Sequence, residues 1–440
     1  MTHLQRASLA FYGALVWLAQ PLLRRKLRRR ALAEPGYAVA VPERFGFYTQ
    51  PAPPAHACIW VHAVSLGETR TAAILMQALR EAMPDLRFVL THGTATGREE
   101  GQRWLREGDF QVWQPWDTPG AVSRFLQHFQ PRMGLLMETE VWPQTVHQCQ
   151  RQGVPLLLVN ARMSEKSLRS ALRWPALMRP AYRGLSSVLA QTEADADRLR
   201  ALGANVGAVT GNLKFDARPD AAQCALGRGW RARTGRPVLM LASSREGEEA
   251  LWLAAWQSLR PEHRTSVRWL VVPRHPQRVD EVQALLQAAG LSVRRRSQWT
   301  QEGPGAGEDG EVWLGDSLGE MALYYSLADL ALLGGSFEPL GGQNLIEAAA
   351  CACPVLMGPH TFNFLEAAQQ AEQVGAALRV QDMAQALAHA LALADEAMQV
   401  TAGEPTLAHM REAALGFAQA HKGAARRTAG QMLQLLAATH

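Results

Sequence analysis

The stretch "ACIWVHAVSLGETRTAAILMQALREAM", Ala57 to Met83, decides the fold of this chain. It opens with a short apolar run and closes with a segment whose apolar residues recur at helical spacing. A buried strand followed by an amphipathic helix is the repeating unit of a parallel α/β sheet. The turn between them holds Ser65 and Glu68. Glu68 either completes a helix capping box with Ser65 or is a catalytic base at the end of a strand.

The same alternation continues along the chain. The apolar runs "LRFVLTH", "FQVWQPW", "RMGLLME", "VPLLLVNA" and "SSVLAQT" follow at helix-sized intervals. The pattern pauses over residues rich in Gly and Pro, and restarts with "PVLMLASS", "SVRWLVVP", "LSVRR", "EVWLGDS", "LALLGG" and "CPVLMGP". We therefore expect two Rossmann-like, doubly wound α/β domains at 31–213 and 237–440, the second including the C-terminal helices, with a linker at 214–236.

Residues 1–30 form a separate, basic segment. They carry seven basic residues and no acid; since the whole chain is +5, the rest sums to −2, which argues against a nucleic-acid binder. Ala7 to Leu23 is uncharged over 17 residues, about 25 Å as a helix, and a basic cluster follows at once. We expect a membrane anchor that either spans the bilayer or lies on it, with the body on the cytoplasmic side.

The overall composition describes an ordered protein with more than one domain. The chain has 440 residues, 48% hydrophobic and 19% charged, which excludes a disordered protein. Its five cysteines form no CxxC pair and no His cluster accompanies them. We expect buried free thiols and no metal site.

Charged residues follow the predicted strands of the N-terminal half, where ligands of such sheets bind. Glu138 and Glu140 come directly after "RMGLLM", where burying two acids costs free energy unless they are bonded or used. Lys214 is one of only four lysines against 41 arginines. It indicates a site that needs a compact positive charge, or it stands there by chance.

The C-terminal half has a glycine-rich segment, "ALLGGSFEPLGGQNLIEAA". Glycines let backbone amides approach an anion such as a phosphate, and Glu347 is placed to bind ribose hydroxyls. The alternative is a plain turn capped by Asn344. Arg274 and His275 follow the strand "SVRWLVVP", so Arg274 either pairs with a phosphate or lies in a surface turn.

Two further motifs have strong structural alternatives. Leu318, Gly319 and Glu320 in "GDSLGEMALYY" are placed to contact a base or ribose, but Ser317 and Glu320 also fit a capping box. The DxD of Asp195 and Asp197 resembles a metal motif of some glycosyltransferases. It is better interpreted as the acidic first turn of a helix capped by Thr192.

Taken together, the motifs are familiar. "VHAVSLGE", "METEVWP", "NARMS", "GNLKFD", "VPRHP", "GDSLGE", "GGSFEPLGGQNLIEAA" and "MGPHTFNF" occur in one order after a basic-flanked anchor. The chain closely resembles the 3-deoxy-D-manno-octulosonic acid (Kdo) transferases of Gram-negative bacteria over nearly its whole length. The resemblance implies a GT-B fold with two domains facing a cleft, and inverting, metal-independent transfer of Kdo from CMP-Kdo to the lipid A precursor, lipid IVA. It implies a place at the cytoplasmic side of the inner membrane, and no cofactor.

The resemblance also implies the roles of individual residues. Glu68 matches the family's proton acceptor, and Glu138 and Lys214 match its transition-state stabilisers. The residues that match its CMP-contacting segments are Pro273, Arg274, Leu318, Gly319, Glu320, Asn344, Leu345, Ile346 and Glu347. "HAVSLGE" and "NLIE" depart mildly from the family pattern; the Leu345 change lies at a predicted helix start and spares Asn344 and Glu347.

Two other functions remain open on the sequence. Another nucleotide-sugar GT-B transferase or epimerase predicts the same cleft but gives no reason for the anchor. A membrane-tethered nucleotide-binding scaffold predicts nucleotide binding without turnover.

Overall fold

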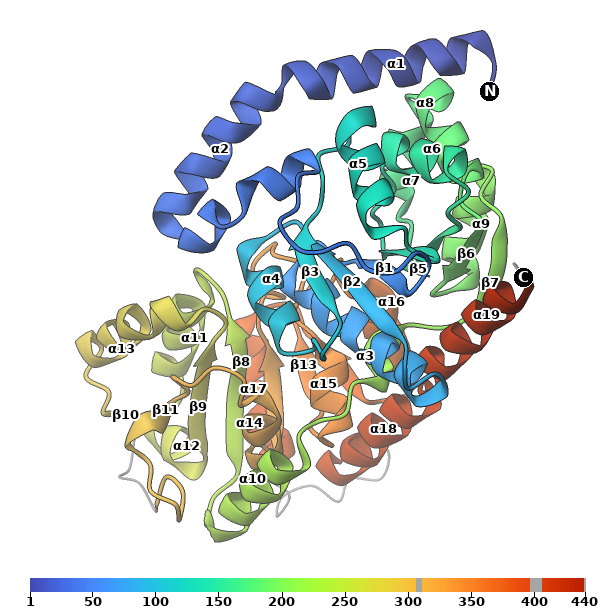
Figure 1. The fold of residues 1–440 in the computed structure, drawn as a ribbon. Coiled ribbons are helices and arrows are strands. Elements are labelled where there is room, and N and C mark those ends of the chain that lie inside the picture. Colours follow the sequence, from blue (N-terminus) through green and yellow to red (C-terminus); the bar gives the residue numbers. More distant parts are fainter. Residues whose placement is uncertain (306–310, 396–405, 439–440) are drawn as a thin grey trace. The chain divides into compact units, whose positions relative to one another are not determined.

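The computed structural model describes residues 1–305, 311–395 and 406–438, and the chain forms two compact units (Figure 1). Unit 1 consists of Met1–Asp216 with Lys422–His440, and unit 2 of Ala217–His421. Each unit is built on a seven-stranded sheet in which every recorded strand pair is parallel. The predicted α/β class with two doubly wound parallel sheets is confirmed.

The sheet of unit 1 has the strand order β3-β2-β1-β4-β5-β6-β7, so the order reverses between β1 and β4. Its strands are β1 (Cys58–His62), β2 (Arg87–His92), β3 (Phe110–Trp113), β4 (Met133–Met137), β5 (Leu156–Ala161), β6 (Ser187–Ala190) and β7 (Val206–Val209). Its helices are α1 (His3–Leu18), α2 (Gln20–Ala33), α3 (Leu66–Ala82), α4 (Ala95–Gln102), α5 (Pro119–Phe129), α6 (Pro143–Arg151), α7 (Glu165–Leu172), α8 (Pro175–Arg183), α9 (Glu193–Ala201) and α19 (Ala424–Ala438), with 3-10 turns η1 (Pro35–Ala38), η2 (Val41–Phe45) and η3 (Leu213–Asp216).

The sheet of unit 2 has the order β10-β11-β9-β8-β12-β13-β14, which reverses between β8 and β12. Its strands are β8 (Val238–Ser244), β9 (Arg268–Pro273), β10 (Val293–Arg295), β11 (Val312–Leu314), β12 (Leu330–Leu333), β13 (Val355–Met357) and β14 (Ala377–Arg379). Its helices are α10 (Ala221–Arg233), α11 (Glu248–Gln257), α12 (Pro261–Ser266), α13 (Val279–Ala288), α14 (Met321–Leu327), α15 (Leu345–Ala350), α16 (Leu365–Gln373), α17 (Met383–Ala394) and α18 (Leu407–Ala420), with 3-10 turns η4 (Pro276–Arg278) and η5 (Arg296–Gln298).

The sheet of unit 1 is covered on both faces, which explains the continuous apolar runs in the sequence. In β1, Trp60 belongs to the apolar cluster on one face, while Ile59 and Val61 belong to the cluster on the other. Successive side chains of a strand point to opposite faces. The five cysteines are buried and free, as expected.

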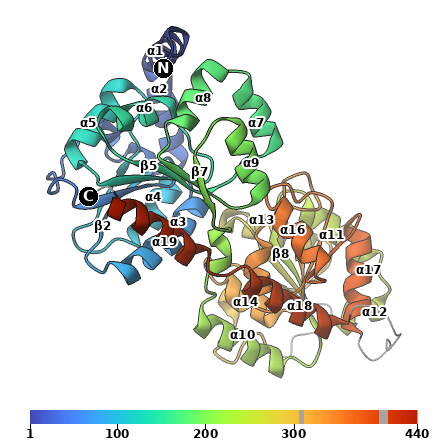
Figure 2. The ribbon, with the colours of Figure 1, turned by 90° about the vertical axis from the view of Figure 1, so that its right-hand side faces the viewer.

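The predicted domain limits need two corrections. The expected linker at 214–236 is largely helix α10, which packs against α14 within unit 2. The C-terminal helices do not all belong to the second domain, because α19 returns to unit 1 and lies beside α3 (Figures 1 and 2). Met432 and Leu436 of α19 complete an apolar cluster with strand and α3 residues of unit 1. The helical spacing of apolar residues predicts that α19 has an apolar face, but it does not show which of the two sheets that face covers.

The N-terminal segment also differs from a single apolar helix. Its apolar stretch divides at Ala19 between α1 and α2, with Pro21 in the first turn of α2. Helix α1 contacts α6 and α8, and Gln144 Nε2 donates to the carbonyl oxygen of Leu9 at 2.9 Å. A Cβ atom at Gly13 would come within 2.7 Å of that same nitrogen, so the glycine permits the close approach. In the described part of the chain, no helix combines the length and the apolar character needed to cross a bilayer.

Candidate functional site

The two acids singled out in the N-terminal half lie at the reversal point of the unit 1 sheet. Glu68 is in the first turn of the helix that follows β1, and Glu138 is the first residue after β4. Since β1 and β4 are hydrogen-bonded parallel neighbours, both acids stand at the carboxyl edge of the sheet. Ligands of open α/β sheets bind at this point.

The contacts of Glu68 form only half of the predicted capping box. Ser65 is the N-cap of α3, and its Oγ accepts the backbone N–H of Glu68 at 3.4 Å. In return, the Glu68 carboxylate accepts the N–H of Val64 at 2.8 Å through Oε2, one residue before the N-cap. The expected reciprocal bond to the Ser65 amide is therefore wrong. The carboxylate is held across the strand-to-helix turn, with Ser65 Oγ 3.4 Å from Oε1.

The surroundings of Glu68 give it a pKa near neutrality. Burial raises the pKa of its carboxyl group to about 7, which the Val64 N–H partly opposes. The negative charges of Glu138 and Glu140 contribute to this increase. A carboxylate with a pKa close to the working pH is well suited to take a proton from a hydroxyl group.

Glu138 has the opposite environment. It is 4% exposed, and its φ of 55° lies in the left-handed region, an uncommon conformation for such a side chain. Lys214 Nζ lies 3.0 Å from Oε1, and Arg162 Nε donates to Oε2 at 2.9 Å. Burial alone raises the pKa of Glu138, but the charges of Lys214 and Arg162 outweigh it and hold the pKa below its ordinary value. The two cations therefore favour the ionised form of Glu138.

Lys214 reaches this site through contacts that are distant in sequence. Asn160, at φ 52° near the end of β5, accepts the N–H of Leu213 through Oδ1 at 3.0 Å. Asp216 accepts the N–H groups of Gly423 and Ala425, at 2.5 and 2.6 Å, where α19 begins. Both ends of η3 are therefore fixed, one by the sheet and one by the C-terminal helix.

Sequence reasoning missed Arg162, Asn160 and Asp216 as parts of this site. The motif "NARMS" contains the first two, but nothing in the sequence shows that they reach Glu138 and η3. Glu140, the second acid of "METEVWP", points to a different partner, since Trp142 Nε1 donates to it at 3.0 Å. Burial raises the pKa of Glu140 above its ordinary value.

The DxD motif has the structural role that was expected of it. Thr192 caps α9, and its Oγ1 accepts the N–H of Asp195 at 3.1 Å. Asp195 in turn accepts the N–H of Met163 at 2.7 Å, next to Arg162, and Asp197 pairs with Arg200 at 2.8 Å. Within the three described ranges, no group of three or more His, Cys, Asp or Glu side chains is arranged to hold a metal ion.

In unit 2 the predicted nucleotide-contacting residues gather at one edge of the sheet. Pro273 ends β9 and Arg274 follows it, Leu318 to Glu320 follow β11, and Asn344 to Glu347 follow β12. These strands are parallel members of one sheet, so all three segments lie at its carboxyl edge. The N–H of Arg274 donates to the carbonyl oxygen of Ser244 at 2.9 Å, which joins this edge to the end of β8.

The segment 317–320 is not a capping box. Helix α14 begins at Met321 with Glu320 as its N-cap, and no side chain caps it. Instead, Ser317 Oγ donates to Glu320 Oε2 at 2.5 Å, and Arg296 Nη2 donates to Oε1 at 3.0 Å. Leu318 is 70% exposed and Gly319 has a φ of 85°. The tip of this loop therefore projects from the sheet edge.

The glycine-rich segment differs from the predicted phosphate loop. The N–H groups of Gly335 and Phe337 donate to the carboxylate of Glu248, at 2.6 and 3.0 Å. Asn344 caps the six-residue helix α15, accepting the N–H of Ile346 at 3.2 Å. An internal acid thus occupies amides that the sequence had assigned to a donor phosphate.

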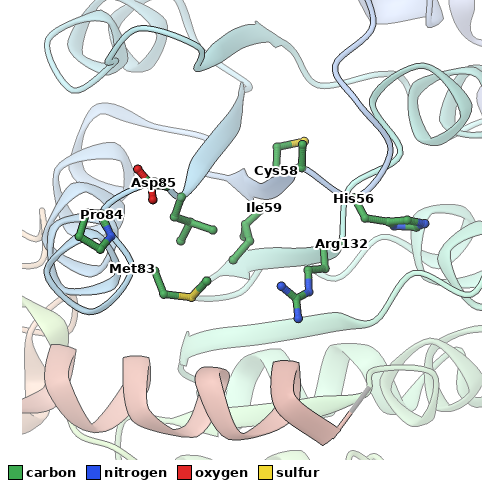
Figure 3. A pocket seen from close by; sticks show the side chains of 9 residues that line it. His56, Cys58, Ile59, Met83, Pro84, Asp85 and Arg132 are labelled. Carbon is green, nitrogen blue, oxygen red and sulfur yellow. The ribbon is translucent and has the colours of Figure 1, made fainter. Parts of the chain in front are cut away.

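The cavity drawn in Figure 3 is not lined by residues of the carboxyl edge of either sheet. It has a volume of about 270 Å³, and its lining includes Cys58, Leu86 and Arg132. These residues lie at or just before the first residues of β1, β2 and β4. The cavity therefore opens at the amino edge of the unit 1 sheet, opposite Glu68 and Glu138, and none of the predicted site residues lines it.

Comparisons with known proteins show which family the chain belongs to. Residues 40–217 match the family model described as 3-deoxy-D-manno-octulosonic-acid transferase (kdotransferase). The 3-deoxy-D-manno-octulosonic acid transferase of Bordetella pertussis is 49% identical over 420 residues, covering 93% of this chain and 95% of its own. The enzyme of that name from Haemophilus influenzae is 33% identical over 387 residues, covering 87% and 89%.

A solved structure is similar to this chain in its fold. A glycosyltransferase from Rickettsia africae matches with a TM-score of 0.55 and 12% identity, covering 86% of this chain and 97% of its own. At this identity the likeness concerns only the fold, and it agrees with two parallel sheets of the glycosyltransferase kind. From its identity to the Bordetella and Haemophilus proteins over most of its length, this chain belongs to the 3-deoxy-D-manno-octulosonic acid transferase family of enzymes.

Proposed function

We propose that this enzyme transfers Kdo from CMP-Kdo to the lipid A precursor lipid IVA, with inversion at the anomeric carbon and without a metal ion. The observation that carries the proposal is the pairing of a near-neutral acid, Glu68, with a charged Lys214–Glu138–Arg162 cluster at one sheet edge. One group takes a proton and the others respond to developing charge, as a direct displacement requires.

In this mechanism the Glu68 carboxylate removes the proton of the acceptor hydroxyl. The hydroxyl oxygen forms the new bond to the anomeric carbon as the bond to the CMP phosphate breaks, and CMP leaves with the electron pair. Attack opposite the leaving group inverts the configuration. Lys214 is suited to stabilise anionic charge on the sugar carboxylate or departing phosphate, while Glu138 fixes the position of its ammonium group 3.0 Å away.

The donor is assigned to unit 2. Arg274 follows β9 and is suited to pair with the phosphate, while Glu347 in the first turn of α15 is suited to accept ribose hydroxyls. Since cationic side chains supply the countercharge, the proposed reaction needs no divalent ion.

A phosphorylated lipid acceptor is supported by the surface beside the unit 1 site. Helix α7 begins three residues after Arg162. It carries the exposed basic residue Arg169 and ends at the exposed Leu172, and Trp174 beyond it is 68% exposed. Apolar side chains among arginines suit an amphiphile with anionic groups.

We also propose that α1 and α2 hold the enzyme at the cytoplasmic face of the inner membrane by lying on the bilayer. Leu9 and Gly13 of α1 are buried, whereas large apolar side chains on its other sides are 48–68% exposed: Leu4, Phe11, Leu15, Trp17 and Leu18. The basic cluster of α2 follows, and such a combination binds anionic lipid surfaces.

The direct test of the activity is to mix the purified enzyme with CMP-Kdo and lipid IVA, measure CMP release, and determine the anomeric configuration of the product by NMR. We expect CMP release that depends on lipid IVA and persists in EDTA, with an inverted product. A retained configuration or strict metal dependence would contradict those parts of the proposal. Transfer from another nucleotide sugar, or CMP binding without turnover, would favour the two alternatives.

The membrane proposal is tested with vesicles. We expect the protein to sediment with vesicles containing anionic phospholipid and to be released by salt, while Phe11→Ser/Trp17→Ser/Leu18→Ser weakens sedimentation without unfolding. Leu415→Ser, which changes an exposed leucine of α18 outside this segment, is the control. Equal sedimentation of the triple variant and the parent would refute the role of this face.

A further inference from the structure

Glu248 joins the two loops at the reversal point of the unit 2 sheet. It is the first residue of α11 and is fully buried. Its Oε2 accepts the N–H groups of Arg245 and Gly335, at 2.9 and 2.6 Å, and its Oε1 accepts that of Phe337 at 3.0 Å. Arg245 follows β8 and Gly335 follows β12, so one carboxylate bonds to the ends of both strands.

The chain is shaped to bring these amides to the carboxylate. A Cβ atom at Gly334 would lie 2.3 Å from the carbonyl oxygen of Ser243, so only glycine lets β12 end this close to β8. Gly335 has a φ of 71°, in the left-handed region that glycine adopts readily. A buried carboxylate costs several kcal/mol unless it is bonded, and three backbone donors at a helix N-terminus supply that compensation.

The effect extends to the predicted nucleotide contacts. Gly335 accepts the N–H of Gly342 through its carbonyl oxygen at 2.7 Å. Gly342 precedes Asn344, the N-cap of α15 and the first of the four residues proposed to contact CMP. Glu248 therefore holds the backbone of Gly335, and Gly335 in turn holds the backbone of Gly342. Through these two hydrogen bonds the carboxylate is linked to the segment that leads into α15.

We propose that Glu248 is a positioning residue for donor binding: its buried carboxylate takes the place of a phosphate within the glycine-rich loop and holds Asn344–Glu347 in the form that receives the nucleotide. The inference rests on the proposed binding of CMP to this edge. Because the amides of Gly335 and Phe337 are already bound to Glu248, the donor phosphate must be held by other groups, such as the side chain of Arg274.

The neighbouring Glu249 provides a matched control. It is 1% exposed and lies on the same turn of α11. It accepts Ser244 Oγ at 2.7 Å and pairs with Arg278 at 2.8 Å. Among the described contacts, none of its bonds goes to the glycine-rich loop. A Glu249→Gln variant therefore breaks a comparable buried network without releasing the segment 334–342.

The experiment compares the full-length parent, Glu248→Gln and Glu249→Gln by calorimetric titration with CMP and by hydrogen exchange. Glutamine keeps the size of the side chain, but its NH₂ group faces amide donors and leaves at least one without an acceptor. We expect Glu248→Gln to weaken CMP binding about tenfold or more, which corresponds to a loss of about 1.4 kcal/mol of binding free energy. In the same variant, hydrogen exchange of the backbone amides in residues 334–342 should become faster. Glu249→Gln should keep CMP affinity within about threefold and leave this exchange unchanged.

Equal CMP affinity in Glu248→Gln and the parent, or equal losses in both variants, would overturn the positioning role. If Glu248→Gln does not fold, Glu248→Ala with added formate replaces it: formate should restore CMP binding and slow exchange, and failure to restore either counts against the proposal. If the parent itself does not bind CMP, the proposed donor is wrong, and exchange in 334–342 alone decides whether Glu248 holds the loop.

Discussion

The carboxyl edges of the two sheets use acids in different ways. In unit 1, Glu68 and Glu138 lie at the proposed reaction site: the pKa of Glu68 is near 7, and Lys214 and Arg162 hold the pKa of Glu138 below its ordinary value. In unit 2, Glu248 is buried and bonds only to backbone N–H groups in the described contacts. We propose that similar strand-to-helix turns serve proton transfer in one unit and loop architecture in the other. The surroundings of the carboxylates differ: Glu68 accepts one backbone N–H and has two acids nearby, Glu138 contacts two cations, and Glu248 accepts three backbone N–H groups.

The largest expected effect comes from removing the base. Glu68→Gln keeps a side-chain acceptor for the Val64 N–H but takes no proton, so turnover should fall at least about a hundredfold. CMP affinity should stay at the parental value. Steady-state rates and titration with CMP measure the two effects. If the variant keeps most of its activity, Glu68 serves only the turn, and Glu140 becomes the next candidate for the base.

The same variant should gain stability, because the raised pKa of Glu68 means that its charged form is unfavourable when folded. Protonation of Glu68 in the folded state stabilises the fold. This contribution is fully present below the unfolded-state pKa of about 4.5 and is lost as the pH rises through the folded-state pKa of about 7. At pH 8 we expect Glu68→Gln to be more stable than the parent, by on the order of 2 kcal/mol at most. Below pH 4.5 the difference should vanish. Urea unfolding at the two pH values measures it, and equal parental and variant stability at pH 8 would argue against a strained carboxylate.

The third prediction concerns the carboxyl edge of the unit 2 sheet. Arg274→Ala should weaken CMP binding by about 1–3 kcal/mol, roughly 5- to 150-fold, by removing a charge-assisted contact. Arg264→Ala is the control, since Arg264 lies before β9 on α12 and donates to backbone carbonyl oxygens. Titration with CMP gives both values. Unchanged affinity in Arg274→Ala would move the donor phosphate to other groups.

The pH dependence tests which edge controls turnover. Because Glu68 as the proposed base must be deprotonated to act, kcat/KM should rise as pH increases and level off above about 7, falling about tenfold per unit below it. Rates from pH 5 to 8.5, normalised to the folded fraction, check this. A profile without an inflection near 7 would indicate that another step or group is limiting.

The smallest expected effect concerns the cap. Ser65→Ala removes the acceptor for the Glu68 N–H and should cost about 1 kcal/mol of unfolding free energy. Turnover should change much less than in Glu68→Gln, since Val64 still holds the carboxylate. Chemical denaturation and steady-state rates measure the two. A loss of activity as large as that of Glu68→Gln would show that Ser65 Oγ takes part in the chemistry.

The sequence by itself determined the α/β class, the strands of both cores and which turns carry acids, because buried parallel strands must be apolar on both faces. It missed the short strands β7 and β14, which carry little apolar signal, and it gave α19 to the wrong unit. Only the tertiary structure decided what each acid meets: Glu138 with Lys214 and Arg162, and Glu248 with the amides of the glycine-rich loop. Local sequence sets helices, strands and caps through neighbouring residues, whereas the pKa and role of a carboxylate depend on charges and donors that folding brings from distant parts of the chain.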